Sequence, residues 1–180
     1  MLKGGRIVGN KKLLKLICAA NALFVLGYFL FCALLMYINI LYPYPLNISY
    51  DYESGMEALR LRIYIRDTFQ QNAVAAAQWA LYLGYMAAGV IAAFDIFKKG
   101  QVRLTKAYFK IPVISLASMF LISMLFILAD LVFMQGRFSG NYLTRLLTMG
   151  SYLIRVSLYY VIWCAACQCI AGKFVKRKPE

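Results

Sequence analysis

A single uncharged stretch, residues 16–42, limits what this chain can fold into more than any other feature of its sequence. As an α-helix rising ~1.5 Å per residue, it is longer than the hydrocarbon core of a bilayer, which is ~30 Å thick. Lysines precede it, as in a secretory signal, but the apolar part of such a signal covers only about 7–15 residues. We therefore expect this segment to remain in the protein as a membrane-spanning helix.

Three further apolar runs follow, over residues 73–97, 111–134 and 147–172. The chain of 180 residues is 63% hydrophobic and only 15% charged, and a soluble domain of this size cannot bury so much apolar surface. The sequence predicts an all-α membrane protein with a single domain, a bundle of four transmembrane helices. Pro112 is expected in the first turn of the third helix, where its missing N–H costs little.

The basic residues predict how these helices are oriented. Lysine and arginine cluster before the first run, in the connection at 98–110 and in the tail at 173–180, whereas the loop at 43–72 is nearly neutral. Since positive charge marks the cytoplasmic side, both termini are expected in the cytoplasm and residues 43–72 outside. The net charge of +13 then reflects topology and contact with anionic lipid headgroups, and no nucleic-acid binding is expected.

Small size and compact loops favour a bacterial inner membrane as the location. The alternative is the endoplasmic reticulum membrane of a eukaryote, because Lys176 and Lys178 near the end of the tail would then serve as a retrieval signal.

Small residues recur at every fourth position of the second apolar run. On a helix they lie along one slowly drifting stripe, which lets a second backbone approach closely and gain contacts that lipid cannot supply. We expect this stripe to pack against another helix of the same bundle, and a face for a second copy or a partner is the alternative. Its members are Ala76, Ala80, Gly84, Ala88 and Ala92.

Asp130 and Arg155 are charges within the third and fourth apolar runs. Counted from the basic anchors Lys110 and Lys173, both lie ~27–30 Å along their helices, at the same predicted depth. An intramembrane ion pair between neighbouring antiparallel helices is therefore expected. We interpret it as a structural clamp, with a proton or ion relay as the functional alternative.

The loop at 43–72 is the only sizeable segment expected outside the membrane. Its stretch "LRLRIYIR" alternates apolar and polar residues, and "NISYDYESG" alternates upstream of it. This period of two predicts a β-hairpin that lies over the outer helix ends; an amphipathic helix over 57–72 is the alternative. In either case a partner or anionic ligand is expected to bind the polar side, formed by Arg60, Arg62, Tyr64 and Arg66. The alternative is a lid whose apolar side seals the bundle and whose arginines contact headgroup phosphates.

The absence of histidine excludes imidazole metal ligands and histidine general bases. No phosphate-binding glycine loop or nucleophile motif is present either, so no catalytic, cofactor-binding or metal-binding residues are expected. In the fourth run, Cys164 and Cys167 share a helix face that Cys169 does not. Small apolar packing residues are the preferred interpretation; the alternatives are acylation, or a metal site that includes Cys18.

Three polar or amphipathic side chains inside the apolar runs could hydrogen-bond between helices: Asn21, Gln78 and Trp79.

These features favour a small membrane protein that acts by binding a partner, either a membrane protein or further copies of itself, and that catalyses nothing. The alternative is an oligomeric subunit of a transporter or channel, which would require polar residues along one helix face through the middle of the membrane. The topology, with four spans, both ends inside and a basic tail, is similar to that of membrane immunity proteins that protect bacteria from pore-forming toxins. That resemblance implies a protective role exerted through protein binding.

Overall fold

The computed structural model describes residues 8–41, 52–99 and 106–175, which form four helices and the turn that joins the last two. The helices are α1 (Val8–Leu41), α2 (Tyr52–Lys99), α3 (Lys106–Met134) and α4 (Ser139–Val175). Each contains a stretch that is long and apolar enough to cross a membrane. The fold is therefore all-helical, as in an integral membrane protein that crosses the bilayer several times.

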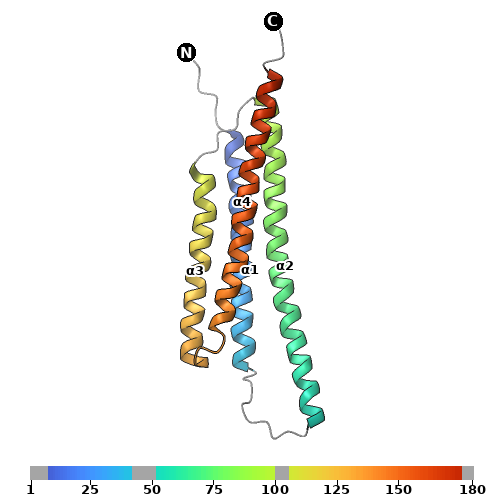
Figure 1. The fold of residues 1–180 in the computed structure, drawn as a ribbon, viewed down its shortest axis with the longest axis vertical. Coiled ribbons are helices and arrows are strands. Elements are labelled where there is room, and N and C mark those ends of the chain that lie inside the picture. Colours follow the sequence, from blue (N-terminus) through green and yellow to red (C-terminus); the bar gives the residue numbers. More distant parts are fainter. Residues whose placement is uncertain (1–7, 42–51, 100–105, 176–180) are drawn as a thin grey trace.

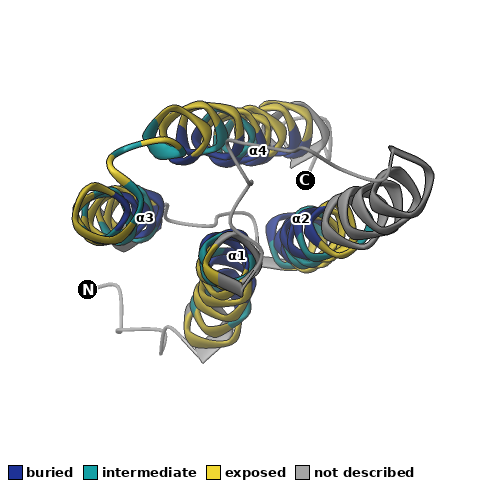
Figure 2. Ribbon diagram, turned by 90° about the horizontal axis from the view of Figure 1, so that it is seen from below, coloured by how far each residue is buried: buried dark blue, intermediate teal, exposed yellow. Residues whose placement is uncertain are grey.

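The helices stand side by side and alternate in direction (Figure 1). Helix α1 contacts α2 and α3, and α4 contacts the same two helices, so the order around the ring is α1, α2, α4, α3. The largest interface is that between α1 and α2. Seen end-on, buried residues face the centre of the ring and exposed residues face away from it (Figure 2).

One end of the molecule, which we call the basic end, contains the starts of α1 and α3 and the ends of α2 and α4 (Figure 1). Among the described side chains, five exposed lysines lie on the helices near this end: Lys11, Lys12, Lys15, Lys98 and Lys110. The opposite end contains the turn between α3 and α4. The first and last helices therefore begin and end on the same side of the molecule, as four antiparallel spans require.

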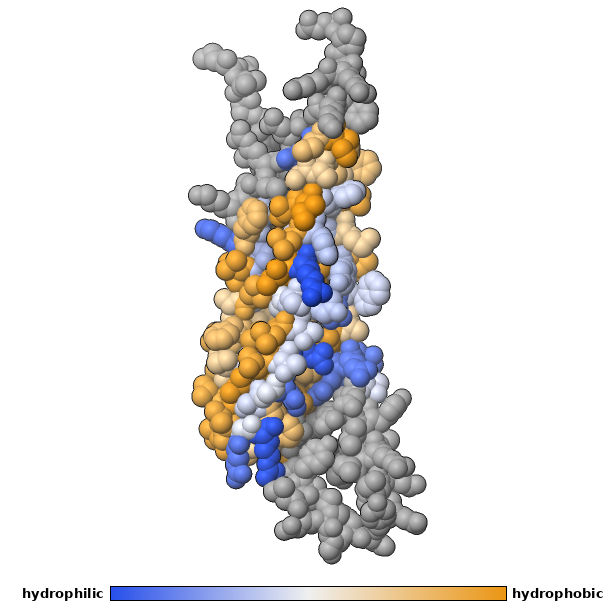
Figure 3. Space-filling view, viewed as in Figure 1, coloured by the Kyte–Doolittle hydropathy of each residue, from blue (hydrophilic) through white to orange (hydrophobic). Residues whose placement is uncertain are grey.

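The outer surface between these ends is strongly apolar (Figure 3). Large hydrophobic side chains point outward from every helix, and Val132 and Phe94 are 75% and 74% exposed. Apolar surface that extends over every helix in this way is rare on soluble monomers. Lipid is therefore the natural solvent of this surface.

Glycine lets α1 and α2 approach closely at two points. A Cβ added to Gly27 of α1 would overlap the Cβ of Ala77 on α2, and a Cβ added to Gly84 of α2 would overlap that of Ala20 on α1. Each contact pairs a glycine on one helix with an alanine on the other. Close backbone approach of this kind is a main source of helix association in lipid, where no hydrophobic effect drives helices together.

The small-residue stripe predicted for α2 faces the interior over only part of its length. Ala88 and Ala92 are buried and Gly84 lies against α1, but Ala80 is half-buried and Ala76 is exposed. A spacing of four residues advances about 400° around a helix, so such a stripe drifts by about 40° at each step. At the N-terminal end of the stripe, Ala77 occupies the inward position instead of Ala76.

The β-hairpin expected over residues 43–72 is wrong for the part that the structure describes. Residues from Tyr52 onward form the first turns of α2, and positions 42–51 lie outside the described residues. The alternative prediction of a helix over 57–72 gives the observed secondary structure. A short alternating run does not distinguish strand from helix on its own, and extending an existing helix avoids the cost of nucleating a two-stranded hairpin.

Three further helix starts differ from the predicted spans, and that of α1, at Val8, precedes the span expected from residue 16. Helix α4 begins at Ser139, about two turns before the span expected from residue 147. Helix α3 begins at Lys106, so Pro112 lies inside the helix and not in its first turn. Polar residues at these helix starts concealed the extra turns from an analysis based on hydrophobicity.

Candidate functional site

A hydrogen-bond network links all four helices in the middle of the membrane-spanning region. The Asn21 side-chain amide of α1 donates to the Tyr85 hydroxyl of α2 over 2.9 Å, and its oxygen accepts from the Ser115 hydroxyl of α3 over 3.1 Å. The Tyr85 hydroxyl in turn lies 3.2 Å from the Ser157 hydroxyl of α4. The prediction that Asn21 bonds between helices is confirmed.

This network is costly to build unless every member finds a partner. Asn21 is only 1% exposed, and a buried amide without hydrogen bonds in an apolar environment loses several kcal/mol. Because each helix contributes one residue, the network holds all four at a common depth. Asn21, Tyr85 and Ser157 each lie close to the midpoint of their spans.

A second set of hydrogen bonds lies farther from the basic end. The Tyr28 hydroxyl of α1 bonds with the Ser123 hydroxyl of α3 and donates to the backbone carbonyl of Tyr142 on α4 over 3.3 Å. All three residues are at most 1% exposed. Between them, the two sets of bonds set the register of α1 against α3 and α4.

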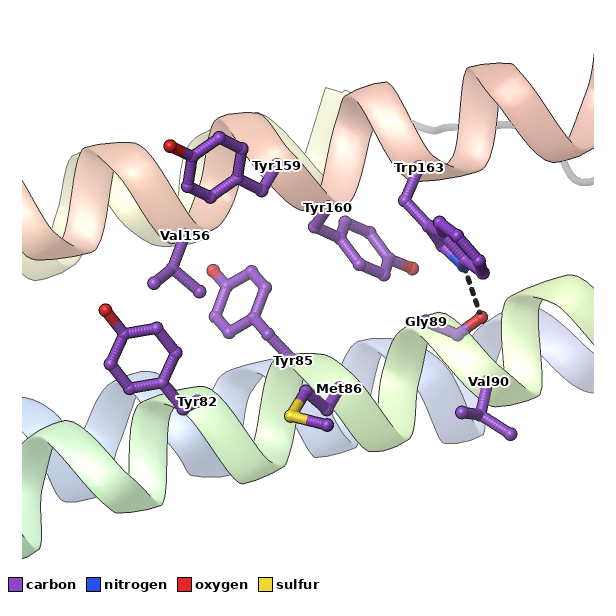
Figure 4. Close-up of a pocket in the computed structure, with 9 residues that line it drawn as sticks. All are labelled: Tyr82, Tyr85, Met86, Gly89, Val90, Val156, Tyr159, Tyr160 and Trp163. Carbon is purple, nitrogen blue, oxygen red and sulfur yellow. Dashed lines mark hydrogen bonds between the residues drawn. The ribbon is translucent and has the colours of Figure 1, made fainter.

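Two grooves open sideways on either side of the central network. One, of about 400 Å³, lies between α2 and α4 and is lined mainly by aromatic side chains (Figure 4). The other, of about 510 Å³, lies between α1 and α3, with Asn21 and Ser115 among its lining residues. Since Tyr85 lines the first groove and bonds to Asn21 in the second, the network forms a polar partition between two lipid-facing grooves.

Tyr160 is the most buried aromatic residue contributed by α4 to the first groove. Its ring packs edge-on against Tyr85, with 5.7 Å between centroids, and it points from α4 toward α2 (Figure 4). Its hydroxyl has no hydrogen-bond partner among the described residues. Beside it, the Trp163 indole donates to the Gly89 carbonyl over 3.2 Å and ties the two helices together.

The outward face of α4 is unexpectedly polar. Six residues spaced three or four apart share this side of the helix, and all are exposed except one that is half-buried. Figure 3 shows a pale-to-blue band that climbs obliquely from the end opposite the basic end to the middle of this hydrophobic surface. We call this surface the α4 polar face, and its residues are Asn141, Thr144, Thr148, Ser151, Arg155 and Tyr159.

Local hydrogen bonds satisfy part of this face. The Thr148 hydroxyl donates to the carbonyl of Thr144 over 2.9 Å, and the Ser151 hydroxyl donates to that of Thr148 over 2.8 Å. Hydroxyls bonded to their own helix are tolerated in lipid. No bond of this kind satisfies a guanidinium, so Arg155 sets the chemical character of the face.

Arg155 lies at the midpoint of the span Ser139–Ala171, about 24 Å along the helix from either end. Ser157, two residues from Arg155, bonds to Tyr85, which is also central in its own span. Helix α2 therefore supports the central position of Arg155 independently of α4. In the described part of the chain, no residue pairs with the guanidinium. An arginine at this depth costs about 2.5–3.5 kcal/mol even on the most lenient scale.

The structure does not bring Asp130 and Arg155 together, and the predicted ion pair is wrong. Asp130 is buried at the end of α3, where its Oδ2 accepts from the Phe138 N–H over 3.0 Å and from the Ser139 hydroxyl over 2.8 Å. Arg155 is about 24 Å farther along α4. Counting inward from Lys110 and Lys173 failed because α4 is longer than α3 and extends farther toward the basic end, so the two anchors are not level (Figure 1).

Asp130 instead stabilises the turn into α4. The carboxylate receives hydrogen bonds at the start of the helix, where free N–H groups and the helix dipole favour negative charge. Its backbone carbonyl accepts from the N–H of Gly136, which has a positive φ of 76°. The second carboxylate oxygen, Oδ1, has no hydrogen-bond partner among the described residues.

The remaining predicted positions lie apart from this centre. The side chains of Arg60, Arg62, Tyr64 and Arg66 are outside the described part. Trp79 is 65% exposed.

Cys164 and Cys167 are buried, while Cys169 and Cys18 are exposed. This division matches the helix geometry expected for the fourth run. Within the described ranges, no three histidine, cysteine, aspartate or glutamate side chains come close enough to hold a metal ion.

Comparisons with known protein families, with curated proteins and with solved structures give no match to this chain. The site must therefore be interpreted from its own chemistry.

Sequence reasoning identified Asn21 but missed its partners Tyr85, Ser115 and Ser157. It also noted Arg155 without recognising that the residue faces outward. The usable signal was present: serine, threonine and asparagine recur at spacings of three and four ahead of Arg155, on one side of a helix. A polar stripe within an apolar run is as informative as an apolar stripe within a polar one.

Proposed function

We propose that this protein is a multi-pass membrane protein that binds a membrane-protein partner through the α4 polar face and performs no catalysis of its own. The observation that carries the proposal is the outward-facing Arg155 in the middle of its span. Lipid is the worst solvent for such a group, whereas a protein surface can supply hydrogen bonds and a counter-charge. A partner that covers the face relieves the free-energy cost of exposing Arg155 to lipid, and this relief favours binding.

The proposed arrangement in the cell follows from the distribution of charge. The four helices form a transmembrane bundle with the basic end in the cytoplasm, where lysines meet anionic headgroups. We propose a bacterial inner membrane as the location. The immunity-type role, in which such a protein neutralises a pore-forming toxin, is one form that partner binding would take.

Photo-crosslinking in the native membrane tests this function. A photoreactive residue at position 148 would lie on the α4 polar face, and one at position 121 provides a control, because Leu121 is 61% exposed on the apolar outside of α3. A discrete crosslinked protein is expected from position 148 and only lipid adducts from position 121. Lipid adducts from both positions would contradict the proposal.

A second candidate function, as a subunit of a transporter or channel, is favoured by one observation. The network of Asn21, Tyr85, Ser115 and Ser157 places polar groups at mid-depth, where an ion or small solute would need them. The bundle is, however, closed by apolar side chains around it. Ion flux into liposomes that contain only this protein, abolished by Asn21→Leu, would establish this function in place of the first.

A further inference from the structure

We propose that the partner of the α4 polar face is a transmembrane helix with an aspartate or glutamate in mid-span, and that this carboxylate pairs with Arg155. The inference rests on the proposed function and specifies the chemistry of the partner.

Charge complementarity points to a carboxylate. The guanidinium group presents a planar set of donors that a carboxylate accepts through two parallel hydrogen bonds. In mid-membrane a lone arginine and a lone carboxylate are both costly, and pairing relieves both. A partner with only hydroxyl or amide groups would satisfy the hydrogen bonds of Arg155 but leave its charge uncompensated.

The spacing of the face points to a helix as the element that covers it. Asn141, Thr144, Thr148, Ser151 and Arg155 follow one another at alternating intervals of three and four residues. This repeat of 3.5 residues is the seam of two helices that cross at a small angle in a left-handed sense. Threonine and serine are also among the residues that allow close helix approach in membranes.

Exposed apolar side chains border this seam on both sides and would complete the interface. Leu147 and Leu158 are 67% and 55% exposed along one border, and Trp163 is 52% exposed beyond Tyr159 on the other. The proposed contact thus has a polar centre and an apolar margin that remains compatible with lipid.

Among the described residues, a second copy of this chain offers no carboxylate at the depth of Arg155. A twofold dimer through the α4 polar face would bring two Arg155 side chains together, and like charges repel. The described carboxylates of a copy inserted in the same direction lie at other depths: Asp95 is about 15 Å from Tyr85 toward the basic end, and buried Asp130 bonds to the start of α4.

A lipid phosphate is also at the wrong depth. Long basic side chains reach the headgroups when they lie near the end of a span. A hydrocarbon core of ~30 Å centred on this span leaves about 15 Å between the Arg155 backbone and either headgroup layer, which is farther than one side chain reaches.

Synthetic helices in vesicles test the proposal. The purified full chain and a Leu/Ala transmembrane peptide are labelled for energy transfer and reconstituted in phosphatidylcholine, with Asp, Asn, Lys or Leu at the centre of the peptide. The chain is expected to bind the Asp peptide about tenfold more tightly than the Leu peptide. Arg155→Leu should abolish this preference, Arg155→Glu should transfer it to the Lys peptide, and the control Arg137→Leu, at the α3–α4 turn, should keep it.

The transfer of preference in Arg155→Glu also shows that the variant folds. Equal binding of the Asp and Leu peptides by the unaltered chain overturns the proposal. Two other results also overturn it. Self-association of the chain that depends on Arg155 would identify a second copy as the occupant. Peptide binding that depends on Arg155 only when phosphatidylglycerol is added would identify a lipid as the occupant. If position 148 still crosslinks to a protein in native membranes, only the carboxylate is refuted; if it does not, the proposed function fails too.

Discussion

Among single residues, Asn21 has the clearest structural role, because its amide bonds to side chains from two other helices. Asn21→Leu would leave the Tyr85 and Ser115 hydroxyls short of a partner, and we expect it to lower the free energy of unfolding in detergent by about 1–2 kcal/mol. The control is Ala19→Leu, at an exposed position of the same helix. Denaturant titration followed by tryptophan fluorescence measures both, and equal stability of the two variants would argue against the network.

Asp130 and Arg155 are expected to behave as independent residues. Asp130→Ala removes the acceptor at the start of α4 and should cost about 0.5–2 kcal/mol, with Asp130→Asn less severe because one amide oxygen still accepts. Arg155→Leu should leave the stability of the isolated protein unchanged or raise it, since no described residue depends on the guanidinium. A loss of equal size in both single variants, with no further loss in the double variant, would restore the ion pair predicted from the sequence.

At the scale of helices, the α1–α2 interface depends on where each methyl group is located. Gly27→Ala places a Cβ where Ala77 already has one, and we expect it to cost about 1–3 kcal/mol through overpacking. Ala77→Gly in the same chain should recover most of this loss, because the methyl group has then only moved from one helix to the other.

The matched control for this exchange is Gly140→Ala, since a Cβ at position 140 meets no atom within 4 Å. It should be neutral or slightly stabilising, as expected for Gly→Ala in an exposed helix. Thermal unfolding of the three variants and the unaltered chain measures the effect. An unchanged midpoint in Gly27→Ala would mean that the helices are not in close contact there.

Helix α2 illustrates where sequence periodicity misleads. Eight residues with perfect alternation predicted a strand, yet these residues continue a helix whose later turns pack against α1 and α4. An alternating sequence places apolar and polar side chains on opposite sides of a strand. The backbone adopts that strand only where the surroundings of the two sides differ in the same way. The apolar runs were reliable for the opposite reason, because only a helix satisfies its own backbone groups in lipid.

At the scale of the whole molecule, the sequence was sufficient for the four helices but not for their depth relative to one another. Helix number follows from long apolar runs, but register is set by contacts such as Asn21–Tyr85 and Tyr28–Ser123, which no run of hydrophobicity encodes. The α4 polar face could not be predicted for the same reason, because the side of a helix that faces outward is known only when the positions of its neighbours are known.

The proposed orientation makes a testable prediction for the whole molecule. In a variant without native cysteines, a cysteine at position 140 should react with a membrane-impermeant maleimide added to intact cells. Cysteines at positions 3 and 178 should react only after the cells are permeabilised, because the basic end is expected in the cytoplasm. The reverse pattern would contradict this orientation.

The central claim is that the α4 polar face is covered by protein in the native membrane, and a lipid-soluble carbene tests it most directly. Photolabelling followed by mass spectrometry would compare the protein in native membranes with the purified protein in phosphatidylcholine vesicles. We predict that the region from Thr144 to Tyr159 is labelled in the vesicles and protected in the native membrane, while the exposed Leu121 and Val132 of α3 are labelled in both. Equal labelling of the α4 polar face in the two preparations would show that lipid covers it, and would contradict the claim.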